Sequence, residues 1–161
     1  VAVTKTKPIA MIDEAARAGQ RIFGENYAQE AAEKMEARPD LEWHFIGSLQ
    51  SNKVKLVVGR AKLIESVDRL KLAEEIGRVA LGKGVVQDVL LQVNIGNEGT
   101  KHGIDPREGA DTVTRLGSIK GLRLRGLMSL PPIDVEERVA RERFAELRSC
   151  LETWRRGLDG D

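Results

Sequence analysis

The order of apolar segments along the chain constrains the fold more than any other feature. Short β-type runs alternate six times with longer amphipathic runs, and the links between them are short. The predicted strands cover residues 1–5, 20–24, 41–47, 61–67, 86–95 and 122–128. Because parallel strands need long crossovers, this alternation predicts a parallel sheet joined by helices.

Helix signals fill the spaces between the strands. The predicted helices cover residues 8–19, 26–38, 49–59, 69–82, 105–117 and 134–156. Asn26 or a neighbour, Asp68 and Asp105 precede three of them, as helix N-caps do. In the last helix, acidic and basic residues alternate at helical spacing, which predicts an exposed face with local ion pairs.

Two architectures satisfy this pattern: an open doubly wound sheet and a (β/α)8 TIM barrel. The dinucleotide-binding motif G-x-G-x-x-G does not follow the first strand, so the dinucleotide version of the open sheet lacks support. We therefore expect a single α/β barrel domain over residues 1–161. It would contain about six of the eight units and lack its N-terminal helix and last two βα units.

Composition removes several classes of function. The net charge is +1 and there are only six aromatic residues, which argues against nucleic-acid binding. No apolar run approaches the length of a membrane span. His44, His102 and Cys150 do not have the spacing of a metal site. The single cysteine fits a reducing, cytoplasmic location, and its amphipathic context indicates a packing residue.

Lys5 stands at the carboxyl end of the first predicted strand. Strand alternation puts Val1, Val3 and Lys5 on one face, which suits a barrel interior. Barrel proteins place their working groups at the carboxyl ends of strands. A free lysine amine titrates near ~10.4, and an apolar approach or a cationic neighbour such as Lys7 favours the reactive neutral form. Lys5 is thus a candidate for a Schiff base with an aldehyde; the alternative is a solvated loop lysine.

Other strand ends add candidates at the same rim. Asn26 offers an amide, or serves as a helix cap. His44 is a rim ligand or a satisfied core histidine. Met128 and Ser129 end the sixth strand, where Met128 packs against a flat ring or fills the core. The glycine-rich loop at 94–103 presents backbone amides to an anion, or is a mobile rim loop.

Five blocks of the chain resemble the pyridoxal phosphate homeostasis protein family, single-domain relatives of the alanine racemase barrel. They are VAVTKTKP, FGENYAQE, LEWHFIGSLQSNK, VNIGNEGTKHGI and LRLRGLMSLPP, in order and spacing. The resemblance implies a fold-type-III barrel that binds pyridoxal 5'-phosphate (PLP). Lys5 would carry the cofactor as a Schiff base.

The resemblance also implies which residues surround the cofactor. These are Asn26, His44, Ile46 and Met128, to which we add Ser129 at the end of the same strand as Met128. The family's C-terminal blocks, which supply most of the phosphate grip, have no counterpart here. We therefore expect a cytoplasmic, monomeric PLP carrier or buffer that serves PLP-dependent apoenzymes. We expect no established catalytic activity and no binding to nucleic acid or to a membrane.

Other functions share the barrel and the lysine. A PLP-dependent racemase needs a second base opposite the lysine, and the only tyrosine is Tyr27, at a helix start. A Schiff-base aldolase would use Lys5 against a sugar ketone. A pure interaction module is a further alternative if the final units are truly missing.

Overall fold

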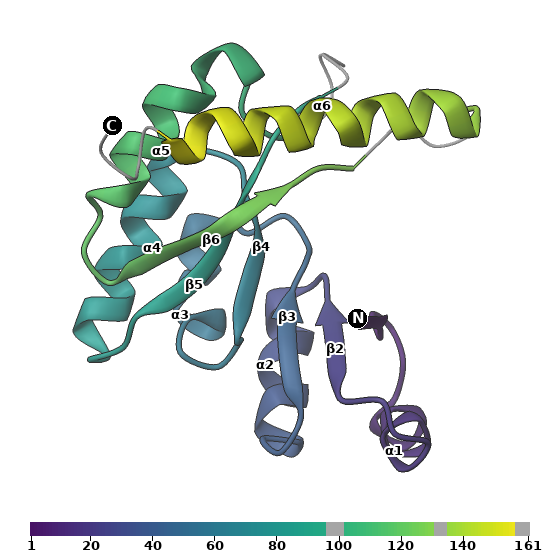
Figure 1. Ribbon diagram of the computed structural model, residues 1–161. Helices are drawn as coiled ribbons and strands as arrows, with labels where there is room; N and C mark the ends of the chain where they lie inside the picture. Colours follow the sequence, from purple (N-terminus) through teal and green to yellow (C-terminus); the bar gives the residue numbers. More distant parts are fainter. Residues whose placement is uncertain (96–101, 131–134, 157–161) are drawn as a thin grey trace.

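A computed structural model describes residues 1–95, 102–130 and 135–156. Its centre is a six-stranded parallel sheet whose strands follow the order of the chain (Figure 1). The strands are β1 (Ala2–Val3), β2 (Ile22–Glu25), β3 (Glu42–Phe45), β4 (Leu63–Val67), β5 (Gln87–Gln92) and β6 (Leu122–Met128). Each strand pairs in parallel with the next.

One α-helix follows each strand along the chain. The helices are α1 (Ile9–Arg17), α2 (Ala28–Ala37), α3 (Val54–Val57), α4 (Leu70–Gly82), α5 (Gly109–Gly117) and α6 (Glu137–Arg156). Short 3-10 turns at Ser51–Lys53 and Pro106–Glu108 precede α3 and α5. Helix α6 lies against α5 and β6 (Figure 1).

The strand order decides between the two predicted architectures. A doubly wound sheet reverses its strand order at a switch point, whereas the strands here run from β1 to β6 without reversal. The barrel-type arrangement is therefore confirmed for these six units. Strand β6 coincides with its predicted range, but β1 ends at Val3, two residues earlier than predicted.

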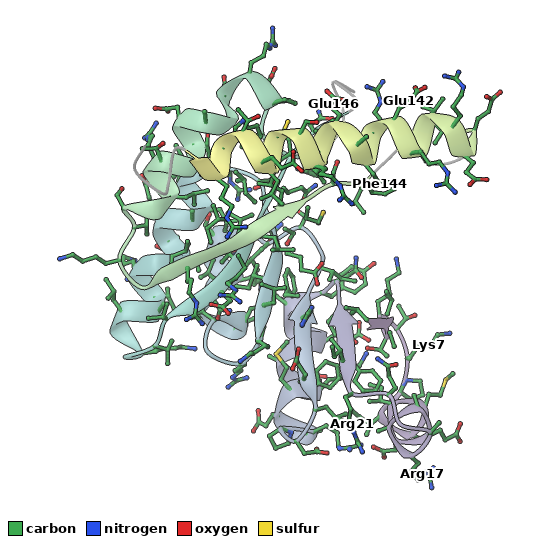
Figure 2. The ribbon with its side chains drawn as sticks, viewed as in Figure 1. Lys7, Arg17, Arg21, Glu142, Phe144 and Glu146 are labelled. Carbon is green, nitrogen blue, oxygen red and sulfur yellow. The ribbon has the colours of Figure 1, made fainter. Side chains whose placement is uncertain are left out.

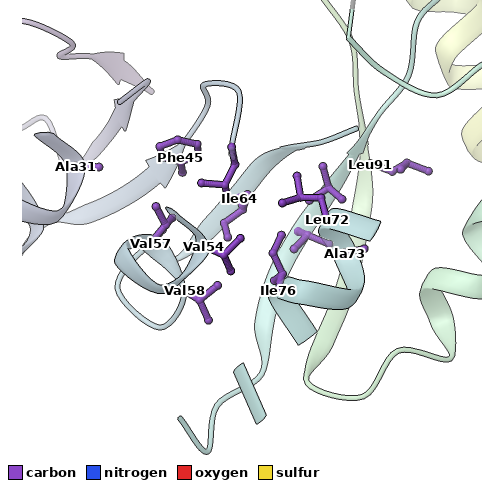
Figure 3. Packing of buried hydrophobic residues seen from close by; sticks show 14 of the residues in the cluster. Ala31, Phe45, Val54, Val57, Val58, Ile64, Leu72, Ala73, Ile76 and Leu91 are labelled. Carbon is purple, nitrogen blue, oxygen red and sulfur yellow. The ribbon is translucent and has the colours of Figure 1, made fainter. Parts of the chain in front are cut away.

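The hydrophobic core lies between the sheet and its helices. Phe23 and Trp43 project from adjacent strands, with ring centroids 5.6 Å apart and planes inclined by 40°. Figure 3 shows Ile64 of β4 packing among side chains of α3 and α4, including Ile76. Each such buried side chain stabilises the fold by roughly 1.5–3 kcal/mol. Cys150 packs at the edge of this core, as predicted.

Helix starts were predicted with mixed success. Asp105 caps its turn as expected, because its carboxylate accepts a hydrogen bond from the backbone N–H of Arg107. Asn26 and Asp68 are not caps: α2 and α4 begin after Tyr27 and Arg69, without a side-chain cap. Gly96 and Gly99 of the predicted anion-binding loop lie outside the described residues.

The exposed face of the last helix carries local ion pairs. The exposed ion pairs of α6 are confirmed by Arg138–Glu142 and Arg141–Glu137 at i,i+4 spacing. Among the described helices, none combines the length and apolar character needed to cross a membrane.

Candidate functional site

Strand register brings three of the predicted site residues to one rim of the sheet. Val3 pairs with Gly24, and Gly24 pairs with His44. Lys5, Asn26 and Ile46 each follow two residues later on their own segments. A hydrogen bond from Ile46 N to Glu25 O, 2.9 Å long, continues the pairing beyond β3. The carboxyl ends of β1, β2 and β3 therefore hold these three residues as neighbours.

Lys5 lies in a turn rather than on the strand. The backbone N–H of Lys7 donates to the carbonyl oxygen of Thr4 at 3.0 Å, and Thr6 has a positive φ of 62°. Lys5 is exposed, and so are Val1 and Val3, at 61% and 53%. The apolar approach expected for this amine is thus not formed by these two valines. Lys7 projects outward from the segment between β1 and α1 (Figure 2).

A buried ionic cluster lies directly beneath this turn. Lys34 Nζ donates to Glu25 Oε1 and to Glu30 Oε1, each at 2.6 Å. The Thr4 hydroxyl also donates to Glu25 Oε1, at 2.7 Å. The relative exposures of Glu25 and Lys34 are 0% and 5%. Hydrogen bonds from charged side chains therefore link helix α2 and strand β2 to the segment that carries Lys5.

This cluster was not predicted from the sequence. Lysine is rarely buried unless it is paired, so a lysine such as Lys34 is by default expected at the surface. A signal was present, however. Helical spacing places Lys34 beside Ala31 and Met35 on the buried side of α2, and strand alternation puts Glu25 on the same face as buried Phe23.

Asn26 has an unused hydrogen-bonding atom. Its Oδ1 is buried and has no hydrogen-bond partner among the described residues. Its backbone is held against Gly47, where an added Cβ would lie 2.1 Å from the Asn26 carbonyl oxygen. The Asn26 backbone is thus closely packed, and its side-chain oxygen is a buried acceptor without a partner among the described residues.

The floor beside this rim is apolar and closely packed. An added Cβ at Gly24 would lie 2.9 Å from Val1 Cγ1 and 3.0 Å from Ile46 Cδ1. Ile46 itself is half-buried. Glycine at position 24 thus allows the side chains of Val1 and Ile46 to pack directly over the backbone of β2.

His44 lies one layer deeper and is held between two carboxylates. Its Nδ1 is 2.6 Å from Glu65 Oε1, and its Nε2 is 3.2 Å from Glu42 Oε1. These hydrogen bonds, first that to Glu65, raise the pKa of His44 above its usual value despite partial desolvation. The two carboxylates therefore stabilise the protonated form of His44 relative to a free imidazole.

Met128 and Ser129 lie at the opposite edge of the sheet, at the end of β6. Both are half-buried, and the Ser129 hydroxyl donates to the carbonyl oxygen of Val93 at 2.8 Å. Strand pairing joins Met128 to Gln92 of β5 and not to β1. The structure therefore does not bring these two residues together with Lys5 through neighbouring strands.

The chain is similar to a well-defined group of proteins. A family profile described as "Alanine racemase, N-terminal domain" matches residues 1–160. The pyridoxal phosphate homeostasis protein of Aquifex aeolicus is 40% identical over 155 residues, which cover 95% of this chain and 68% of that protein. The protein of the same name from Pseudomonas aeruginosa is 40% identical over 161 residues, covering 99% of this chain and 70% of that one.

A solved structure gives the same result. PipY of Synechococcus elongatus, solved with PLP bound, superposes with a TM-score of 0.89 at 35% identity, covering 97% of this chain and 74% of that one. An alanine racemase from Clostridium difficile superposes with a TM-score of 0.78 but only 14% identity, so it supports the fold alone. The chain belongs to the pyridoxal phosphate homeostasis protein family, built on the barrel of the alanine racemase N-terminal domain.

Proposed function

We propose that this chain binds pyridoxal 5'-phosphate and acts in intracellular PLP homeostasis as a carrier or buffer of the cofactor. The observation that carries the proposal is the likeness to PipY, whose structure contains PLP and matches 97% of this chain. The relatives from Aquifex aeolicus and Pseudomonas aeruginosa, named for PLP homeostasis, support the same role.

The residues at the rim of β1–β3 fit such a ligand. PLP has a flat apolar ring, polar ring substituents and an aldehyde. In our proposal the ring lies against the apolar side chains of Val1 and Ile46 over Gly24, and the buried, unpartnered Asn26 Oδ1 lies at the same rim. Lys5 supplies an amine at the same rim. In our proposal His44 lies under the ring, while Met128 and Ser129 complete the site from β6.

Lys5 is the proposed point of attachment. When bound, PLP supplies an aldehyde whose carbon forms a covalent link with the lysine nitrogen, with release of water. Lys5 holds the cofactor, and the rim residues orient it. A storage role requires nothing further from the chain, since no second base has to face the amine. Tyr27, which a racemase would need as that base, is 57% exposed at the start of α2.

Location and partners form the finer part of the proposal. We place the protein in the cytoplasm, where a half-buried single thiol such as Cys150 stays reduced. We expect it to act as a monomer and to hand PLP to PLP-dependent apoenzymes.

Reductive trapping tests the attachment. The chain is incubated with PLP, reduced with borohydride, digested and analysed by mass spectrometry. We expect an absorbance band on PLP addition and a phosphopyridoxyl group on Lys5. The Lys5→Ala variant should lose both, whereas Lys7→Ala, which changes a lysine two residues away, should keep both. Full labelling of Lys5→Ala, or racemisation of free alanine by the wild type, would contradict the proposal.

A further inference from the structure

The backbone around Lys5 adopts a conformation that its own residues do not favour. Residues 4–7 form a tight turn closed by the 3.0 Å hydrogen bond from Lys7 N to Thr4 O. Thr6 has a φ of 62°, which is uncommon for a β-branched residue. Such a conformation persists only where the surroundings hold it. The question is which groups do so.

One ionic cluster holds the turn on both sides of Lys5. On the N-terminal side, the Thr4 carbonyl oxygen accepts a hydrogen bond from Lys34 Nζ at 2.6 Å. On the C-terminal side, the Thr6 N–H donates to Glu30 Oε1 at 2.7 Å. The same Glu30 oxygen accepts from Lys34 Nζ. A single ammonium and a single carboxylate thus connect the two neighbours of Lys5.

The cluster is anchored in the interior of the protein. Glu25, with no exposed surface, binds both Lys34 and the Thr4 hydroxyl through Oε1. Burying ions has a large desolvation cost, and apolar residues of similar volume often stabilise a fold as well or better. The distinctive contribution of this cluster is therefore geometric, because its hydrogen bonds are directional and end on the turn.

We propose that Glu25, Lys34 and Glu30 form a clamp that fixes the backbone on both sides of Lys5 and so positions its amine for PLP. These are positioning residues, since they act on the turn and not on the ligand. The inference rests on the proposed function in taking Lys5 as the attachment point. The clamp itself is a property of the PLP-free chain and can be measured there.

Glu30 provides the cleanest test, because its side chain is partly exposed and its removal leaves Lys34 paired with Glu25. In Glu30→Ala the Thr6 amide loses its acceptor. In Glu30→Gln the charge is also lost, but an oxygen that can accept remains. Glu33→Ala is the matched control, an exposed glutamate on the same helix.

Two readouts are needed: hydrogen exchange of the Thr6 amide in the PLP-free chain by NMR, and PLP affinity by absorbance titration. Loss of a charge-assisted hydrogen bond predicts about tenfold faster exchange and about tenfold weaker PLP binding in Glu30→Ala. Glu30→Gln should stay close to the wild type, and Glu33→Ala should match it.

The outcomes separate the two ideas. Equal exchange in Glu30→Ala and Glu33→Ala would refute the clamp, and faster exchange with unchanged PLP affinity would refute its role in positioning Lys5. A wild-type chain that takes up no PLP would refute the proposed function instead, while the exchange data alone would still decide whether the turn is clamped.

Discussion

The Nζ of Lys34 lies 2.6 Å from Oε1 of Glu25, and both side chains are buried between β2 and α2. The ion pairs of α6 are different: they join arginine to glutamate on the exposed face of the helix, as in Arg141–Glu137. The two kinds of pair differ energetically. Exposed pairs contribute little to stability, whereas breaking a buried pair leaves an uncompensated charge.

The first prediction concerns this buried pair. Lys34→Met should lower the free energy of unfolding by about 3–5 kcal/mol, because Glu25 is left charged and unpaired. The double variant Glu25→Gln with Lys34→Met should recover most of that loss. Guanidinium denaturation followed by circular dichroism measures both. Lys71→Met, at an exposed position of α4, serves as the control, and a loss of equal size there would contradict the explanation.

The second prediction concerns the pH dependence that His44 introduces. Its pKa is raised above 6.5, mainly by the hydrogen bond to Glu65. The stability that this imidazolium contributes is fully present below the ordinary value and is lost as pH rises through the raised one. The stability advantage of wild type over His44→Gln should therefore shrink on going from about pH 6 to about pH 9.

Urea denaturation over this range, repeated on Glu65→Gln, checks the cause. In the Glu65→Gln background, the difference in stability between chains with His44 and chains with His44→Gln should depend much less on pH. A pH profile that is the same with and without Glu65 would show that another group is responsible.

The third prediction compares two glycines. An added Cβ at Gly47 would lie 2.1 Å from the Asn26 carbonyl oxygen, whereas at Gly82 it would meet nothing within 4 Å. Gly47→Ala should reduce stability by about 1–3 kcal/mol, the usual effect of overpacking, and weaken PLP binding by displacing Asn26. Gly82→Ala, at the end of α4, should raise stability by about 0.5 kcal/mol. Thermal unfolding and PLP titration of the two variants give the comparison, which fails if both behave alike.

The fourth prediction concerns the thiol of Cys150. Burial, and then the nearby Glu146 charge, raise the pKa of this group. It should react with an aromatic disulfide reagent more slowly than free cysteine at mildly alkaline pH, and at the free rate after denaturation. Equally fast reaction in the native chain would mean that α6 does not hold this side chain against the core.

Much of the fold could be predicted because hydrophobic periodicity is local. Residues 122–128 alternate in a way that only a strand satisfies, and they form β6. The choice between a barrel and a doubly wound sheet needed the strand order, which depends on pairings between segments distant in sequence. The missing dinucleotide motif favoured the barrel, the family resemblance implied it, and the order of β1 to β6 confirms it.

The candidate site was less predictable. The position of Lys5 at the end of β1 could be inferred, but its turn could not, since Thr6 is a poor residue for a positive φ. The turn is hydrogen-bonded to Lys34 and Glu30, which both lie on α2. Asn26 is a residue type that often caps helices, yet its backbone packs against Gly47, which follows β3. Tertiary contacts override local preference at these positions.

The uninterrupted order of the strands has a consequence for how the protein is made. Val3 pairs with Gly24 and Gly24 with His44, so these first pairings each close a loop of about twenty residues, at a small entropic cost. Every strand finds its partner already synthesised immediately before it. Since a ribosome releases the N-terminal segments first, the sheet can grow one strand at a time while the polypeptide is still emerging.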